Sequence, residues 1–174
     1  MKIHEYQAKE LFKKSAVPVL RGFPCKTPDQ VAAALEHLDA PVVVVKSQIH
    51  AGGRGKGTLY ADPDCQQKIL EGGVKVAKCA EEARKLSVQL LGNYLKTKQT
   101  GATAKRVNTV YIEEGCRIAR ELYFSVLLDR TVARPVIVSS QAGGMDIEEV
   151  AESEPEKILR LHFDASTGLE DHAA

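Results

Sequence analysis

The residues best suited to bind an anion are a lysine and a glycine-rich loop that follows it closely. Lys46 comes directly after four valines at residues 42–45, and residues 52–57 read Gly-Gly-Arg-Gly-Lys-Gly. An ammonium group at the rim of a strand, facing a loop with exposed amides, can bind phosphate oxygens. The same residues also fit a strand-terminal lysine that reaches solvent beside a flexible loop. By themselves they favour this second interpretation slightly.

The loop does not match the two most familiar phosphate-binding motifs. A Walker A motif needs serine or threonine after the Gly-Lys pair, and neither follows Gly55-Lys56. Thr58 stands where the dinucleotide motif GxGxxG has its last glycine. The sequence therefore argues against a simple P-loop and against a Rossmann site.

Acidic residues lie on both sides of a break in the expected β structure at Cys116. The carboxylates of Glu113, Glu114 and Glu121 could accept hydrogen bonds from ribose hydroxyls. Taken alone, such residues are more often surface acids. The five histidines are too scattered to form a recognisable catalytic pair, and only His50 adjoins the glycine loop.

Composition excludes several classes of protein. The chain has 174 residues, 44% hydrophobic content and a formal charge of +1, which is typical of a globular protein with one domain or two small lobes. Near neutrality argues against a nucleic-acid binder. The four cysteines lack zinc-site spacing and are interpreted as reduced thiols. The longest apolar run, residues 41–45, is too short to cross a membrane, and the opening residues lack a signal segment, so we expect a cytoplasmic protein.

Periodicity and capping residues predict the helices that position these groups. His4 is expected to help start the first helix, and Pro18 prevents its continuation. Thr27 is a suitable N-cap before Pro28, which fits the first helical position. The predicted helices cover residues 4–14, 28–37, 80–91 and 146–151.

The strands are predicted from β-branched runs and from alternation. The valines at residues 42–45 are typical of a strand that is buried on both faces. Residues 122–129 alternate between apolar and polar, which with residues 136–139 predicts an antiparallel hairpin. The other predicted strands cover residues 73–78 and 109–113. The mixture of strands and helices indicates the α/β class.

Three further segments are expected to form loops or a helical turn. Residues 49–73 contain many glycines and lack periodicity, so we expect a mobile loop with an insertion. Residues 155–159 are expected to start a helical turn. Lys96, Lys98, Lys105 and Arg106 flank a Thr/Gly/Ala loop and are interpreted as a solvated basic loop.

Several segments, taken together and in order, resemble the β subunits of succinate–CoA ligases. The longer matching segments are Met1-Lys2-Ile3-His4-Glu5-Tyr6-Gln7-Ala8-Lys9 and Val45-Lys46-Ser47-Gln48-Ile49-His50-Ala51-Gly52-Gly53-Arg54-Gly55-Lys56. The shorter ones are Gly72-Gly73-Val74, Leu90-Leu91-Gly92, Tyr111-Ile112-Glu113-Glu114-Gly115, Ile118-Ala119-Arg120-Glu121-Leu122-Tyr123 and Gly143-Gly144-Met145-Asp146-Ile147-Glu148. They occur in the order found in the family and are spread over nearly the whole chain, so coincidence is a poor explanation.

This resemblance implies an ATP-grasp fold of two small lobes with antiparallel sheets, incomplete at its carboxyl end. Residues 1–20 together with 117–174 would form part of one lobe, and residues 21–116 the smaller one. The nucleotide-binding residues implied by the resemblance are Lys46, Gly53, Arg54, Gly55, Glu113, Cys116 and Glu121. Lys46 would contact phosphates, the glycine loop would fold over them, and Glu113 with the backbone near Cys116 would border the purine and ribose.

The resemblance also implies a reaction and its partners. Family members join succinate to coenzyme A (CoA) while cleaving a nucleoside triphosphate, through a phosphohistidine on a partner α subunit, a step of the tricarboxylic acid cycle. The apolar Leu20 in the base-selecting region favours ATP over GTP. The family's Mg²⁺ ligands and its CoA-ligase domain would lie beyond Ala174, so this chain alone is expected to be inactive.

Two other functions fit the same segments. Malate-activating relatives share these amino-terminal motifs, so the chain could belong to a malate–CoA ligase β subunit. It could also be a non-catalytic remnant that binds a nucleotide or a partner subunit without performing chemistry. The simplest alternative is an ordinary α/β domain whose glycine loop binds no ligand.

Overall fold

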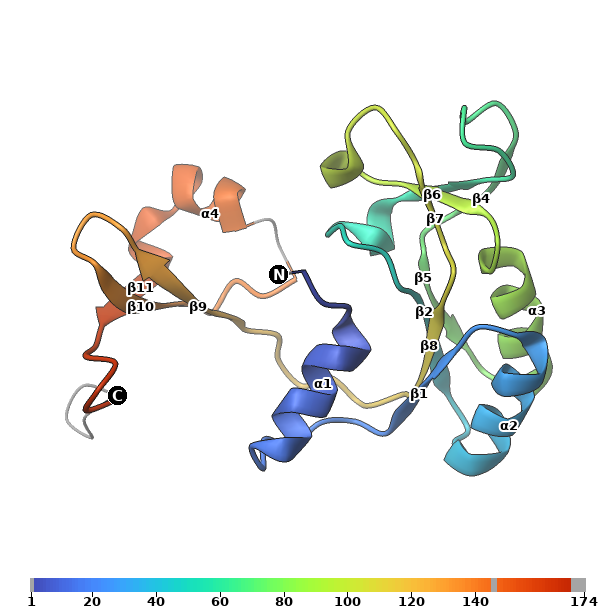
Figure 1. The fold of residues 1–174 in the computed structure, drawn as a ribbon, viewed down its shortest axis with the longest axis horizontal. Helices are drawn as coiled ribbons and strands as arrows, with labels where there is room; N and C mark the ends of the chain where they lie inside the picture. The colour runs from blue at the N-terminus through green and yellow to red at the C-terminus, as the bar shows by residue number, and fades with distance from the viewer. Residues whose placement is uncertain (1, 145–146, 170–174) are drawn as a thin grey trace. The chain divides into compact units, whose positions relative to one another are not determined.

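The computed structural model describes residues 2–144 and 147–169. The chain divides into two compact units, Met1–Cys116 and Arg117–Ala174, and each is described by itself. Within the described residues, none of the helices has the length and apolar character that a membrane span needs. The arrangement of elements within each unit is visible in Figure 1.

The first unit is built on a four-stranded antiparallel sheet. Its strand order is β1-β8-β2-β5, so the last strand in sequence lies between the first two. The strands are β1 (Gly22–Cys25), β2 (Val43–Ser47), β5 (Val74–Ala77) and β8 (Val110–Glu114). Strands near residues 42–45, 73–78 and 109–113 are confirmed.

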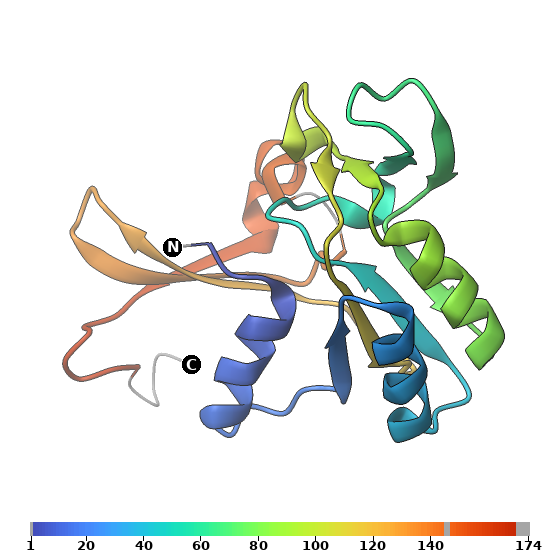
Figure 2. The ribbon, with the colours of Figure 1, turned by 45° about the vertical axis from the view of Figure 1, so that its right-hand side comes forward.

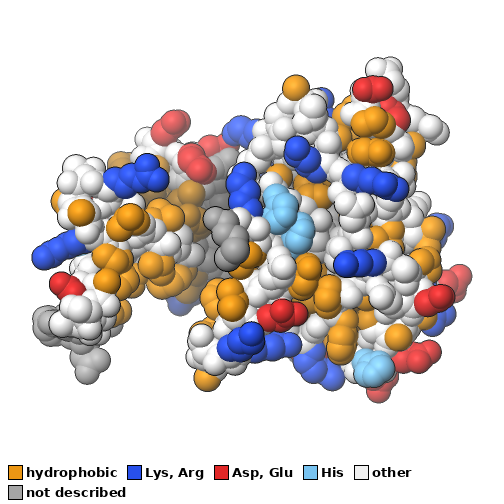
Figure 3. Space-filling view, in the orientation of Figure 1, with side chains coloured by type: hydrophobic (Ala, Val, Ile, Leu, Met, Phe, Trp, Pro, Cys, Tyr) orange, Lys and Arg blue, Asp and Glu red, His pale blue; other side chains and the backbone are white. Residues whose placement is uncertain are grey.

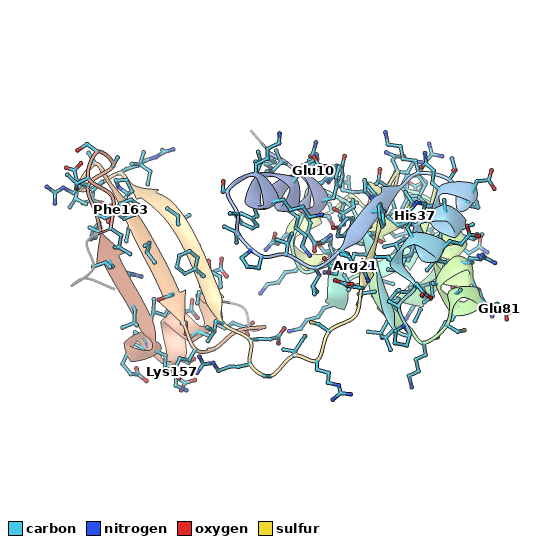
Figure 4. The ribbon with its side chains drawn as sticks, turned by 90° about the horizontal axis from the view of Figure 1, so that it is seen from below. Glu10, Arg21, His37, Glu81, Lys157 and Phe163 are labelled. Atoms are coloured by element: carbon cyan, nitrogen blue, oxygen red, sulfur yellow. The ribbon has the colours of Figure 1, made fainter. Side chains whose placement is uncertain are left out.

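Helices lie on both sides of this sheet (Figure 2). On one side are α2 (Pro28–Leu38) and α3 (Ala80–Leu90), and on the other is α1 (Glu5–Lys14). Seen from below in Figure 4, Glu10 on α1 lies on the opposite side of β1 from His37 on α2. All three helices were predicted, and the Thr27 side chain accepts the expected hydrogen bond from the Gln30 amide at 3.3 Å.

The core fills the space between the sheet and the helices α2 and α3. Val43, Val45 and Ile112 turn toward it and are 3%, 0% and 0% exposed. Val44 and Lys46 alternate with them and are only partly buried. The prediction of a strand buried on both faces was therefore wrong for β2: valines at alternate positions point to opposite faces, and along this strand only the face toward α2 and α3 is fully buried.

A second small sheet occupies the region predicted as a mobile insertion. Its order is β4-β3-β6-β7, with β3 (Thr58–Tyr60), β4 (Lys68–Glu71), β6 (Tyr94–Lys96) and β7 (Lys105–Arg106). Leu59 and Leu95 are fully buried between these strands and the rest of the unit. The prediction of a mobile insertion was thus wrong, because strands of two to four residues are too short to show alternation. Lys98, Lys105 and Arg106 are exposed, as predicted, but Lys96, Lys105 and Arg106 lie on strands.

The second unit contains a three-stranded antiparallel sheet with the order β11-β10-β9. Its elements are β9 (Tyr123–Asp129), β10 (Arg134–Ser140), α4 (Ile147–Ser153) and β11 (Ile158–His162). The predicted hairpin is confirmed by the pairing of β9 with β10. The helical turn expected at residues 155–159 is a short 3-10 turn at Pro155–Lys157 that leads into β11. Residues 145–146 and 170–174, which include the Met145-Asp146 part of the family match and the predicted start of the last helix, lie outside the described residues.

The two faces of this second sheet differ. One face packs against α4, where Val136 and Val150 are 6% and 0% exposed. The other carries Phe124, Val126 and Leu128, with exposed fractions of 65%, 56% and 66%. In Figure 3, hydrophobic side chains gather on this unit.

Candidate functional site

Lys46 lies between two carboxylates on the α1 side of the sheet. Its Nζ is 2.9 Å from Oε1 of Glu5 and 2.5 Å from Oε2 of Glu113. Glu5 opens α1, whereas Glu113 lies on β8, next to β2. The Glu113 side chain is only 2% exposed, so its buried negative charge needs a bonded cation such as Lys46. Strand pairing thus holds Lys46 at a fixed place on the sheet.

Arg54 ties the glycine loop to the same group. Its Nη2 donates to Oε2 of Glu5 at 2.7 Å, and its Nη1 donates to the Ser47 carbonyl at 2.6 Å. The Glu5 carboxylate therefore binds Lys46 with one oxygen and Arg54 with the other. The structure thus brings Arg54 of the loop and Lys46 of the strand together.

Lys9 is a third cation of this cluster. Its Nζ bonds to Oε1 of Glu113, lies 3.5 Å from Oε1 of Glu5, and lies 5.5 Å from the centre of the Tyr111 ring. Neither Glu5 nor Lys9 was assigned a role from sequence. Their i, i+4 spacing, which places them on one side of α1, is the signal that could have pointed to them. We call Glu5, Lys9, Lys46, Arg54 and Glu113 the charge cluster.

The charge cluster has three cations and two carboxylates. Burial disfavours the charged form of Glu5, but hydrogen bonds from Lys46 and Arg54 outweigh it and lower the pKa of Glu5 to about 2. Burial, together with the charge of Lys46, lowers the pKa of Lys9. The excess of positive charge can be neutralised by an anion.

Glu5 should make stability depend on pH. Its pKa falls from 4.5 to about 2 on folding, so its contribution is complete above pH 4.5 and is lost as the pH falls toward 2. A shift of this size corresponds to about 3 kcal/mol. We expect Glu5→Gln to flatten the fall in the free energy of unfolding between pH 4.5 and 2, measured by urea unfolding. Glu10→Gln, an exposed change on the same helix, should retain the fall. An equally steep fall in Glu5→Gln would contradict the assignment.

The glycine loop is anchored at its base. The Gly72 amide donates to the Gly57 carbonyl at 2.6 Å, and the Gly73 amide donates to the Arg54 carbonyl at 2.8 Å. Gly53 has a positive φ of 69°, which other residues adopt at a cost. A side-chain carbon at Gly55 would meet nothing within 4 Å. The loop is therefore tied down at its base, while the space into which a side chain at Gly55 would point is open.

Two histidines lie beside this loop. The rings of His4 and His50 stack with centroids 4.0 Å apart and an interplanar angle of 13°. Burial lowers the pKa of His4, and the charges of His50 and Arg54 lower it further. His4 also precedes α1, where its amide donates to the Gln7 side chain at 2.8 Å, as expected for a residue that helps to start the helix. Figure 3 shows histidine side chains beside lysine or arginine side chains on the first unit.

The remaining candidates lie elsewhere. Cys116 follows β8 and is exposed. Glu121 belongs to the second unit, where a side-chain carbon at Gly143 would lie 2.3 Å from the Glu121 carbonyl carbon. Only glycine fits such a close approach. Glu121 is thus fixed within its own unit, and its relation to Lys46 stays a prediction.

The charge cluster fits a phosphate ligand better than a metal ion. Lys46 and Arg54 have side chains that are 18% and 21% exposed, so both are partly accessible. Within residues 2–144 and 147–169, no set of three or more histidine, cysteine or acidic side chains could hold a metal ion.

Comparison with known proteins identifies the family of the chain. The sequence profile of the ATP-grasp domain matches residues 2–174. The chain belongs to the ATP-grasp family. The β subunit of ADP-forming succinate–CoA ligase from Opitutus terrae is 50% identical to this ATP-grasp chain over 171 residues, and that from Caulobacter vibrioides is 51% identical over 170 residues. These alignments cover 98% and 97% of the chain but 42% and 41% of the relatives. The ATP-grasp chain therefore spans less than half the length of these proteins.

Solved structures show the same fold at lower identity. The dinucleotide-forming acetyl-coenzyme A synthetase 1 of Ca. Korarchaeum cryptofilum, in complex with coenzyme A, Ca-AMPCP and HgCl⁺, has a TM-score of 0.62 and 18% identity, covering 99% of this chain and 63% of that one. ATP citrate lyase from Methanothrix soehngenii, in complex with citrate and coenzyme A, has a TM-score of 0.59 and 19% identity, covering 97% and 36%. The mixed α/β architecture with antiparallel sheets is thus confirmed as that of ATP-grasp proteins.

Proposed function

We propose that this chain is the nucleotide-binding part of a succinate–CoA ligase β subunit. The observation that carries the proposal is the pairing of Lys46 and Arg54 on one carboxylate beside the open glycine loop. Two cations held this close suit the adjacent oxygens of a polyphosphate. About half of the residues are identical to those of ADP-forming succinate–CoA ligase β subunits, which supports ATP as the nucleotide.

Each residue then has a proposed role. Lys46 and Arg54 contact the phosphates, and the backbone of Gly53 and Gly55 lies over them. Glu113, with the backbone near Cys116, borders the purine and ribose. Glu121 is the nucleotide-site residue contributed by the second unit.

These residues would act on the reaction through their charges. Fixed cations stabilise the negative charge that develops as a phosphoryl group moves, and loss of one such contact commonly costs about 3 kcal/mol. Mg²⁺ would add to the neutralisation of the phosphate charge that Lys46 and Arg54 provide. We expect its ligands in the part of the relatives that this chain does not span.

The activity of the whole protein is part of the proposal. With a partner α subunit carrying the phosphohistidine, it would form succinyl-CoA from succinate and CoA with ATP cleavage in the cytoplasm. The test is acyl-CoA formation by the full-length β subunit and its α subunit with Mg-ATP, CoA and succinate. Faster turnover of malate would identify a malate–CoA ligase, and absence of product with either acid would favour a non-catalytic nucleotide-binding protein.

We also propose how the two ATP-grasp lobes are divided. Residues 1–20 with 117–174 would contribute to one lobe, and residues 21–116 would form the other. The exposed apolar side chains of Leu11 and Phe12 on α1, which are 52% and 50% exposed, support further packing of this helix. Cross-linking of cysteines introduced at positions 12 and 124 would test the division.

The choice of nucleotide can be measured on the chain itself. Calorimetric titration should show tighter binding of Mg-ATP than of Mg-GTP, because Leu20 offers guanine no hydrogen bond. Equal affinity, or a preference for GTP, would contradict the assignment of the base. Binding of neither nucleotide, by the wild type and by variants of the site alike, would contradict the proposed site in this chain.

A further inference from the structure

Glu5 holds the two cations that a phosphate would need. Its two oxygens bind Lys46 and Arg54, one each, at 2.9 and 2.7 Å. We propose that Glu5 occupies the place of the nucleotide phosphates in the free protein and competes with them for Lys46 and Arg54. The inference rests on the proposed function and adds to it a means of setting nucleotide affinity.

The geometry of a carboxylate suits this competition. Like a phosphate, it presents two oxygens on one centre, and both accept charge-assisted hydrogen bonds. Glu5 lies in the first turn of α1, on a different segment from the cations that it binds. Lys46 is held independently by β2 and by Glu113, and Arg54 by the Ser47 carbonyl. Both cations can therefore turn from Glu5 to a ligand without losing their other contacts.

Lys9 makes the exchange feasible. When Lys46 and Arg54 turn to phosphate, Glu5 and Glu113 would otherwise remain as poorly exposed charges, which is costly. Lys9 already contacts Glu113 and lies 3.5 Å from Glu5, so it can serve both carboxylates. The first turn of a helix also stabilises a negative charge through the helix dipole. The bound state thus keeps a counter-ion for Glu5.

The test compares ligands with and without phosphate. Calorimetric titrations of the wild-type chain, Glu5→Gln and Glu10→Gln would use Mg-ATP and adenosine. Since Glu5→Gln removes the competing charge, its affinity for Mg-ATP should rise by roughly tenfold, while its affinity for adenosine should stay constant. Glu10→Gln makes the same change of charge on the same helix and should bind both ligands as the wild type does.

Each outcome decides one question. Unchanged or weaker Mg-ATP binding by a folded Glu5→Gln overturns the competition, as does a parallel rise for adenosine. If Glu5→Gln binds Mg-ATP where the wild type shows no binding, the masking by Glu5 is complete and the inference is supported. If wild-type binding depends on Lys46 but is unaffected at Glu5, only the inference fails. If no variant binds, the proposed function fails and the inference falls with it.

A measurement on the wild-type protein covers the case in which Glu5→Gln does not fold. Carbon-13 NMR of the glutamate carboxylates can follow the titration of Glu5 with and without saturating Mg-ATP. Because the cations that now lower the pKa of Glu5 would turn to phosphate, that pKa should rise on binding. A pKa that stays near 2 in the bound protein overturns the proposal.

Discussion

Replacing Lys46 with alanine should lower the affinity of the chain for Mg-ATP by roughly 100- to 1,000-fold, the usual loss when a fixed cation is removed from a phosphate. The change also leaves Glu113, which is 2% exposed, with Lys9 as its remaining cation among the described residues. Calorimetric titration measures the affinity, and circular dichroism verifies that the variant is folded.

A matched control separates a local effect from a general loss of charge. Lys85 is exposed on α3, which covers the other side of the sheet. Lys85→Ala should therefore bind Mg-ATP as the wild type does. Unchanged affinity in Lys46→Ala would show that the glycine loop and its neighbours are only a structural feature.

Ile112→Ala should lower the free energy of unfolding by about 2–5 kcal/mol, because it leaves a cavity in the centre of the first unit. Ile112 is fully buried on β8, where it pairs with Phe23 on β1 and Val45 on β2. Urea unfolding followed by far-ultraviolet circular dichroism measures the loss.

Ile118→Ala provides the control for this change. Ile118 is the same residue type but is 65% exposed, so its replacement should alter stability by no more than about 0.5 kcal/mol. Comparable losses in the two variants would contradict the placement of Ile112 in the core.

Local signals were enough to predict the helices and the hairpin. Thr27 and Pro28 mark the start of α2 through groups that lie within one turn of each other, and the alternation at residues 122–129 is complete within one strand. Lys46 could be singled out for the same reason, because the valines and the glycine loop flank it in sequence.

The contacts between residues that are distant in sequence could not be predicted from the sequence. Glu113 meets Lys46 only because β8 inserts beside β2, and Glu5 meets Lys46 only because α1 packs on that face. No local pattern specifies either partner. The short strands β3 and β4 were missed for a different reason, since three or four residues show no periodicity and their stability comes from the buried Leu59.

The position of β8 in the sheet has a consequence for folding. β8 is the last strand of the first unit to leave the ribosome, yet it lies between β1 and β2, which are made much earlier. Contacts between residues so distant in sequence form slowly, because the chain must first close a long loop. Until residue 114 has emerged, β1 and β2 lack the strand that joins them, and Lys46 lacks Glu113. The glycine loop and α1 are therefore synthesised well before they can take their final positions, and the nascent chain has to keep its apolar strands from pairing wrongly during that interval.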